Sequence, residues 1–196
     1  MTNWLEYGIR LFEILSISYG TVWFSKKLDK DKLNKVLTME NEFKNKKKIQ
    51  PMLESILYEL DADRVYQTAF SNGDVTFAGH HLKKVSVINE ISGEGFKDLG
   101  LDIQLVPAKV FERNLNDLYE SANDFIISKE FEINDELSAL LKQYDIQTLL
   151  KVKIKNFSGK WVGTLDVCFN SDKNFTREEI AFVKMQAAKL GEIKQN

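Results

Sequence analysis

Two strand-like segments joined by a short turn near the C-terminal end restrict the fold of this chain more than any other feature. Residues 147–154 and 160–169 are rich in β-branched and aliphatic residues, and Asn156-Phe157-Ser158-Gly159 between them favours a tight turn. A connection this short joins antiparallel strands, because parallel strands need a long crossover. The sequence therefore predicts an antiparallel sheet, against which any helices must pack.

The segments around this hairpin complete an α+β pattern. Apolar residues repeat at helical spacing over 52–60 and again in a closing helix, which Thr176 and Glu179 begin as a capping box. Three weaker elements are expected between them: a helix-like piece over 106–118, a short strand over 124–128 and a helix over 136–143. The sequence thus predicts an α+β fold with a central antiparallel sheet flanked by N- and C-terminal helices and preceded by a long N-terminal helical extension.

Two more strands are expected near the start of the sheet. Residues 64–70 alternate as a strand, and Ser71-Asn72-Gly73-Asp74 favours a hairpin turn into a return strand over 75–78. Residues 83–91 form the next strand. Simple alternation along it places Val85 and Val87 on one face and Glu90 on the other.

The first 25 residues are expected to form an apolar helix with a polar stripe. Residues 4–24 carry only Glu6, Arg10 and Glu13 as charged side chains, and as a helix they would span roughly 31 Å, which is close to the thickness of a bilayer core. The three charges are four and three residues apart, so Arg10 can pair with both acids. Three alternatives stay open: a membrane helix in an oligomer, a helix buried in a soluble oligomer, and a helix docked on its own domain. The polar stripe is the expected seam of a homo-oligomer.

Charge divides the rest of the chain into a basic connector and an acidic domain. Residues 26–48 carry nine lysines against four acids, net +5, whereas residues 49–196 carry 17 basic and 23 acidic groups, net −6. A basic connector after an apolar helix suits the anionic cytoplasmic leaflet, and a solvated helical linker is the alternative. The domain, residues 49–196, is expected in the cytoplasm, and its acidity makes a nucleic-acid partner unexpected.

Cysteine and histidine usage argues against several kinds of site. Cys168 is the only cysteine, which excludes an internal disulfide framework and a multi-cysteine zinc site and fits a reducing compartment. His80 and His81 are adjacent, so in a strand they point to opposite sides and make a poor metal site. No metal, cofactor or catalytic residue is therefore expected, and an enzyme is not the expected class.

In order along the chain, these elements resemble the GAF family of small sensor domains over about residues 49–194. The similarity lies in four places: residues 60–65 after the first helix, residues 144–152, the glycine hairpin into Val162-Gly163-Thr164-Leu165, and Phe175 with Glu178-Glu179 before the last helix. The resemblance implies that the terminal helices share one face of a curved sheet and that residues 79–135 cover the other face and line any ligand pocket. It also implies dimers formed through the terminal helices.

The candidate ligand-binding residues are Arg64, His80, Glu90, Glu94 and Phe111. Arg64 could hold an anion, and pairing with the neighbouring Asp61 and Asp63 is the structural alternative. The sequence therefore predicts a non-enzymatic domain that senses a small molecule or nucleotide, or binds a protein, joined to a membrane-associated or oligomerising helix. Two alternatives remain: a membrane-acting effector of mobile-element or defence type gated by the domain, and a ligand-free scaffold that docks a protein partner.

Overall fold

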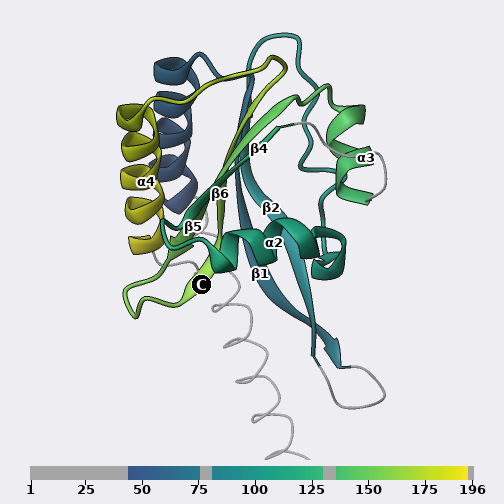
Figure 1. Cartoon of the computed structure of the whole chain (residues 1–196). Coiled ribbons are helices and arrows are strands. Elements are labelled where there is room, and N and C mark those ends of the chain that lie inside the picture. Colours follow the sequence, from purple (N-terminus) through teal and green to yellow (C-terminus); the bar gives the residue numbers. More distant parts are fainter. Residues whose placement is uncertain (1–43, 76–80, 130–135, 194–196) are drawn as a thin grey trace, which may run out of the picture. The chain divides into compact units, whose positions relative to one another are not determined.

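A computed structural model describes residues 44–75, 81–129 and 136–193, in which a six-stranded antiparallel sheet carries helices on both faces (Figure 1). The strands lie in the order β3-β2-β1-β6-β5-β4. Their bounds are Arg64–Val75 for β1, His81–Ser92 for β2, Val106–Pro107 for β3, Phe125–Lys129 for β4, Thr148–Lys155 for β5 and Trp161–Phe169 for β6. The predicted α+β class with a central antiparallel sheet is confirmed for the described residues.

Several predictions concern residues outside these ranges. The apolar helix over 1–25, with Glu6, Arg10 and Glu13, is among them, as are His80 and most of the connector over 26–48. The division of the chain into 1–25, 26–48 and 49–196 therefore stays a prediction. Among the described residues, no helix is both long and apolar enough to cross a membrane.

The helices divide between the two faces of the sheet (Figure 1). Residues 44–60 form a helix that lies beside α4 (Arg177–Glu192) on one face, which we call the helix face. On the opposite face, which we call the cover face, lie the 3-10 helix η1 (Ala108–Phe111), α2 (Glu112–Glu120) and α3 (Glu136–Gln143). The predicted capping box of Thr176 and Glu179 is present at the start of α4, and α3 has the predicted bounds.

Each face has its own apolar core because strand side chains alternate. On the helix face, Leu53, Val65, Leu150, Leu165 and Leu190 are among the buried residues of one cluster. The second cluster, on the cover face, is built from the alternate strand positions and from the covering helices. It includes Tyr66, Val85, Phe111, Leu141 and Leu149.

The first helix runs straight through a proline. The sequence predicted this helix over 52–60 only, yet residues 44–60, with Pro51 among them, are helical throughout. Pro51 is exposed, while Ile49 and Leu53 on either side of it are buried in the helix-face core. This packing outweighs the hydrogen bond that a proline removes from a helix.

The first β-hairpin is longer than the sequence indicated. Strand β1 continues through residues 71–74, and its last residue, Val75, pairs with His81 of β2. The predicted turn at 71–74 was therefore wrong, and Val75 belongs to β1 rather than to a return strand, while residues 76–78 of that predicted strand lie outside the described residues. Pairing of Ser71 and Asn72 with Lys84 and Lys83 extends the ladder across residues whose local preference is for a turn.

A β-bulge in β2 changes the face on which Glu90 lies. Thr68 pairs with Val87 and Gln67 pairs with Asn89, which leaves Ile88 as an extra residue with 42% of its surface exposed. An extra residue in a strand moves the side chains that follow it to the other face. Glu90 therefore lies opposite Tyr66 on the cover face, and the prediction that it faces away from Val85 and Val87 was wrong.

At Gly163, strand β6 passes close to the backbone of β1. A Cβ atom at this position would be 2.0 Å from the carbonyl oxygen of Thr68. We expect Gly163→Ala to lower the free energy of unfolding by about 1 to 3 kcal/mol, because one of the two central strands must shift. Urea unfolding followed by circular dichroism measures this loss. Gly93→Ala is the control, since its Cβ would meet the Phe96 ring at 3.3 Å; equal losses in the two variants would contradict the prediction.

Candidate functional site

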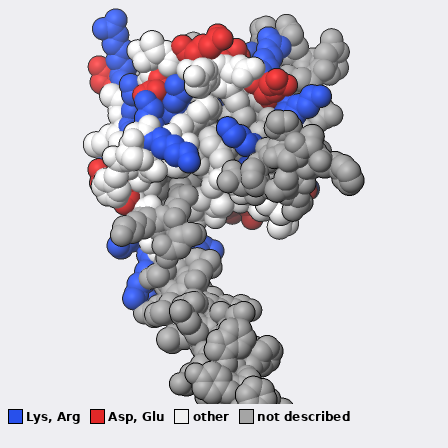
Figure 2. All heavy atoms as spheres, turned by 90° about the horizontal axis from the view of Figure 1, so that it is seen from below, with Lys and Arg blue, Asp and Glu red and all other residues white. Residues whose placement is uncertain are grey.

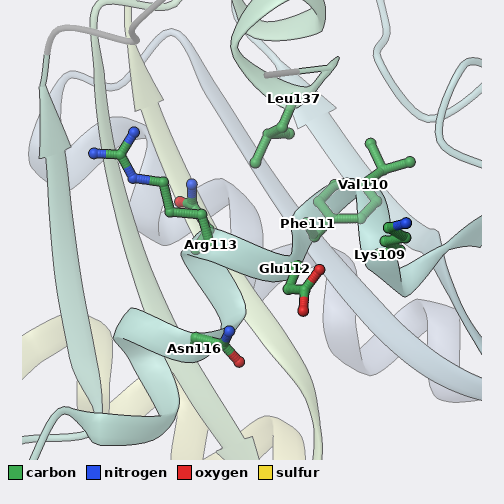
Figure 3. Close-up of a pocket in the computed structure, with 8 residues that line it drawn as sticks. Lys109, Val110, Phe111, Glu112, Arg113, Asn116 and Leu137 are labelled. Atoms are coloured by element: carbon green, nitrogen blue, oxygen red, sulfur yellow. The ribbon is translucent and has the colours of Figure 1, made fainter. Parts of the chain in front are cut away.

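A hollow of about 340 Å³ opens among η1, α2 and α3 on the cover face (Figure 3). Figure 3 shows that η1 and α2 supply most of its lining and that α3 contributes Leu137. Its apolar lining is Val110, Phe111 and Leu137, and its polar lining is Lys109, Glu112, Arg113, Asn114 and Asn116. A volume above about 300 Å³ with an apolar wall and a few polar groups is typical of small-molecule sites.

The local sequence explains why polar side chains reach this hollow. From η1 into α2, Phe111 is buried in the cover-face core and Leu118 is also buried, which leaves Glu112 and Asn116 exposed. Asn114 is the buried polar residue of α2, and its Oδ1 accepts a hydrogen bond from the Ser128 hydroxyl of β4 at 3.4 Å. This contact fixes α2 against the edge of the sheet.

A row of four titratable side chains crosses the central strands on the same face. The pairing registers place Glu90 opposite Tyr66, Tyr66 opposite Asp166, and Asp166 opposite Lys151. Residues directly opposite each other in adjacent strands share a face of the sheet, so these four form one line, which we call the polar row. Tyr66, Asp166 and Lys151 are at most 3% exposed.

The centre of the polar row is a buried ion pair. Lys151 Nζ donates to Asp166 Oδ2 at 2.8 Å, and the Thr164 hydroxyl donates to the same oxygen at 3.0 Å. Asp166 Oδ1 has no hydrogen-bond partner among the described residues. Burial raises the pKa of Asp166, although Lys151, Thr164 and the nearby Tyr66 hydroxyl lower it in part. Desolvating two charges costs several kcal/mol per ion, so such a pair in the middle of a core is a functional candidate.

Two other titratable groups near this ion pair, Tyr66 and Cys168, have raised pKa values. Burial, followed by the charge of Asp166, raises the pKa of Tyr66. The same two causes, in the same order, raise the pKa of the Cys168 thiol, which is fully buried. Both groups therefore stay protonated near neutral pH, and Cys168 is an inert core residue rather than a reactive thiol.

Arg64 lies at the end of the polar row and is only 1% exposed. Its guanidinium carbon is 5.6 Å from the centroid of the Phe96 ring and 5.3 Å from that of the Tyr144 ring. The ion-pair partner of Arg64 is Glu90, with 3.8 Å between Nε and Oε1, whereas Asp63 accepts a hydrogen bond from the Asn170 N–H. Arg64 Nε has no hydrogen-bond partner among the described residues.

Glu90 joins this arginine to the segment that follows β2. The Glu90 carboxylate accepts hydrogen bonds from the Leu99 N–H at 2.9 Å and the Gly100 N–H at 2.6 Å. Burial raises the pKa of Glu90, and the two N–H groups and Arg64 partly oppose this rise. The Tyr144 hydroxyl holds the same segment by donating to Asp102, and burial together with this bond raises the pKa of Tyr144 to about 12.

The five candidate residues from the sequence therefore fall in different places. Arg64 and Glu90 lie together beside the polar row, and Phe111 lines the hollow. Glu94 is exposed in the loop after β2, and His80 is outside the described residues. Sequence reasoning missed the Lys151–Asp166 pair, although each is a charged residue within a strand of buried apolar neighbours, and that pattern could have indicated it.

The outer surface carries lysines that acidic groups largely balance. Asp124 lies 2.6 Å from Lys155 Nζ and 3.2 Å from Lys153 Nζ, and the hydrogen bond from Lys155 is the main cause that lowers its pKa. Figure 2 shows basic and acidic side chains interspersed over the described part of one face. The described residues hold no cluster of three or more His, Cys, Asp or Glu that could bind a metal ion.

Comparisons with known proteins identify the fold. No protein family model and no curated protein matches this sequence. Among solved structures, the blue-light absorbing form of the PixJ GAF domain from Thermosynechococcus elongatus is 17% identical, with a TM-score of 0.54 over 76% of this chain and 87% of that chain. The GAF domain region of a Geobacter sulfurreducens PCA protein is 13% identical, with a TM-score of 0.55 over 79% of this chain and 95% of that chain.

A third similar structure is a phycoerythrobilin-bound GAF domain from a cyanobacterial phytochrome. It is 13% identical to this chain, with a TM-score of 0.51 over 78% of this chain and 94% of that chain. Because all three matches cover most of the GAF domain concerned, the described domain has the GAF fold. The resemblance expected from the sequence is confirmed at the level of the fold.

Removing one charge of the buried pair is expected to destabilise the protein more than removing both. Lys151→Met leaves the Asp166 carboxylate buried without its cation and should cost about 3 to 5 kcal/mol of unfolding free energy. The double variant K151M/D166L removes both charges and should recover most of that loss. Chemical unfolding of the full chain measures both values, and equal losses in the single and double variants would contradict this expectation.

The raised pKa of Asp166 gives the stability a defined dependence on pH. The folded state holds the Asp166 proton more tightly than the unfolded state, whose pKa is near the ordinary 3.8. Binding of this proton therefore contributes its whole stabilising free energy below the unfolded-state pKa. That contribution is lost as the pH rises through the raised pKa of the folded state. As the pH rises above 4, the wild type should therefore lose unfolding free energy relative to K151M/D166L, in which this carboxyl group is absent. Unfolding at several pH values tests this, and a difference that does not change with pH would refute it.

Proposed function

We propose that this protein is a sensory GAF-type domain that binds a small molecule in the hollow among η1, α2 and α3. The observation that carries the proposal is the hollow itself, which places an apolar wall containing Phe111 beside polar side chains on the cover face. The role is binding rather than catalysis, since the lining offers no nucleophile paired with a base.

The lining favours a ligand with both an apolar part and an anionic part. Phe111, Val110 and Leu137 supply the apolar contact, while Lys109 adds a cation and Asn116 an amide at the exposed rim. Amides and cations of this kind can fix the orientation of a ligand whose main affinity comes from the apolar wall. A nucleotide or a small aromatic acid has this chemistry.

The central strands offer a route from the hollow to the terminal helices. In β5, Leu149 belongs to the cover-face core, whereas its neighbour Leu150 belongs to the helix-face core with Leu190 of α4. A ligand that alters the packing of α2 or α3 would therefore change the surface on which α4 and residues 44–60 pack. In this proposal the signal is a shift in population between two packings of those helices.

The same proposal attaches the domain to a membrane or to an oligomer through residues 4–24. The apolar stretch with its Glu6, Arg10 and Glu13 stripe and the basic connector over 26–48 support it. Cell fractionation of the full chain separates the cases. A requirement for detergent indicates an embedded helix, release by high salt indicates a surface association, and a soluble assembly indicates a homo-oligomer.

A scaffold that docks a protein partner is the second candidate function. Its support is the close packing of the cover face, where Leu118, Leu141 and Leu149 are fully buried. A face already filled in this way needs no ligand for its stability. The membrane-acting effector depends on residues outside the described ranges, so it stays a prediction.

Filling the hollow tests the sensory proposal against the scaffold. We expect the melting temperature of the wild-type full chain to rise with at least one member of a panel of nucleotides and small aromatic acids, because a ligand that binds only the folded state stabilises it. Asn116→Trp should abolish this rise by occupying the hollow. Asp117→Trp, on the next position of α2 and outside the hollow, should retain it. No response from the wild type, or equal responses from both variants, would favour the scaffold.

A further inference from the structure

Two backbone N–H groups donate hydrogen bonds to the Glu90 carboxylate, and the Arg64 guanidinium forms an ion pair with it. Leu99 N–H donates to Oε1 at 2.9 Å, and Gly100 N–H donates to Oε2 at 2.6 Å. Arg64 Nε lies 3.8 Å from Oε1. Two backbone N–H groups and a guanidinium directed at one carboxylate have the composition of a protein anion site.

The groups around the Glu90 carboxylate have further contacts that hold them in place. The Arg64 side chain is 2% exposed and its guanidinium lies against the Phe96 and Tyr144 rings. The segment that carries the two N–H groups has separate anchors. Val87 N–H donates to the Ile103 carbonyl at 2.9 Å, and the Tyr144 hydroxyl donates to Asp102.

The shape of the site suits a carboxylate better than a phosphate. The two Glu90 oxygens each take one N–H group, as a planar two-oxygen anion does. The backbone of Gly100 lies so close to these oxygens that little space is left beside them. A Cβ atom on Gly100 would be only 2.9 Å from Glu90 Oε2 and 3.2 Å from Val87 Cγ1. A tetrahedral anion would have to place further oxygens in this crowded space.

We propose that Arg64, Leu99 N–H and Gly100 N–H form a carboxylate-binding site that Glu90 fills in the resting protein, and that a small-molecule carboxylate displaces Glu90 from it. The Glu90 side chain is 9% exposed, so part of it meets solvent, and in this proposal it leaves toward solvent when the ligand enters. The incoming carboxylate takes over both N–H groups and the contact with Arg64. This site is distinct from the hollow of Figure 3 and does not require a ligand there.

The internal carboxylate acts as a competitor, which makes the proposal measurable. A ligand binds only when Glu90 has left the site. Its apparent affinity is therefore its intrinsic affinity multiplied by the fraction of molecules in which the site is vacant. In Glu90→Ala the competitor is gone, and the buried Arg64 charge has no anion beside it. We expect Glu90→Ala to bind formate or acetate at least about tenfold more tightly than the wild type does.

The experiment titrates sodium formate and sodium acetate into the full chain, with sodium chloride at equal ionic strength as the reference. Glu90→Ala should melt below the wild type and recover in a saturable way with either carboxylate. Glu90→Gln is the matched control: its side chain still fills the site, so its recovery should be at least about tenfold weaker. Equal responses of the two variants would overturn the proposal.

A second measurement needs no variant, so it decides the case even if Glu90→Ala does not fold. In the ¹⁵N-labelled wild type, the Leu99 and Gly100 amide resonances should shift with increasing formate and saturate, while chloride leaves them unchanged. Unshifted Leu99 and Gly100 amides at molar formate would overturn the proposal. Asn116→Trp should leave these shifts unaltered, which separates a failure of this site from a failure of the hollow.

Discussion

The pairing of β1 with β6 at the centre of the sheet is the constraint on which the rest of this structure depends. The two backbones approach closely at Gly163, where a side chain would collide with the Thr68 carbonyl. The resulting register sends Val65 and Leu165 to the helix face, and Tyr66 and Asp166 to the cover face. Because the side-chain period of a strand is two, a slip of one residue would exchange the two faces and bring Asp166 against the terminal helices.

That register gives the two faces different chemistry. The helix face is an ordinary apolar core, to which the 44–60 helix contributes Leu53 and α4 contributes Leu190. The cover face has the polar row at its centre, where Asp166 Oδ1 lacks a hydrogen-bond partner among the described residues. Burying an ion pair gives little net stability compared with an apolar core of the same volume. The stability of the cover face therefore comes mainly from the apolar residues around the Lys151–Asp166 pair.

The sequence predicted those parts of the fold that local signals determine. The hairpin at residues 156–159, the Thr176 capping box and α3 all depend on neighbours along the chain, and each is present. The bulge at Ile88 and the continuation of β1 through residues 71–74 depend on pairing between strands, which periodicity within one strand cannot show. The same limit applies to the site: Arg64 and Glu90 were candidates, but their contact exists only because the bulge turns Glu90 toward the cover face.

The bulge also explains how one strand can serve two roles. Before Ile88, β2 contributes Val85 and Val87 to the cover-face core, where they pack as apolar residues. After Ile88, the same face receives Glu90, whose carboxylate meets Arg64 and the N–H groups of Leu99 and Gly100. Without the bulge, this position would face away from the cover, and Arg64 would be a buried cation with no acid at its side. Because a carboxylate is needed beside Arg64 for electrostatic balance, whether it comes from Glu90 or from a ligand, the fold itself creates the competition at this site.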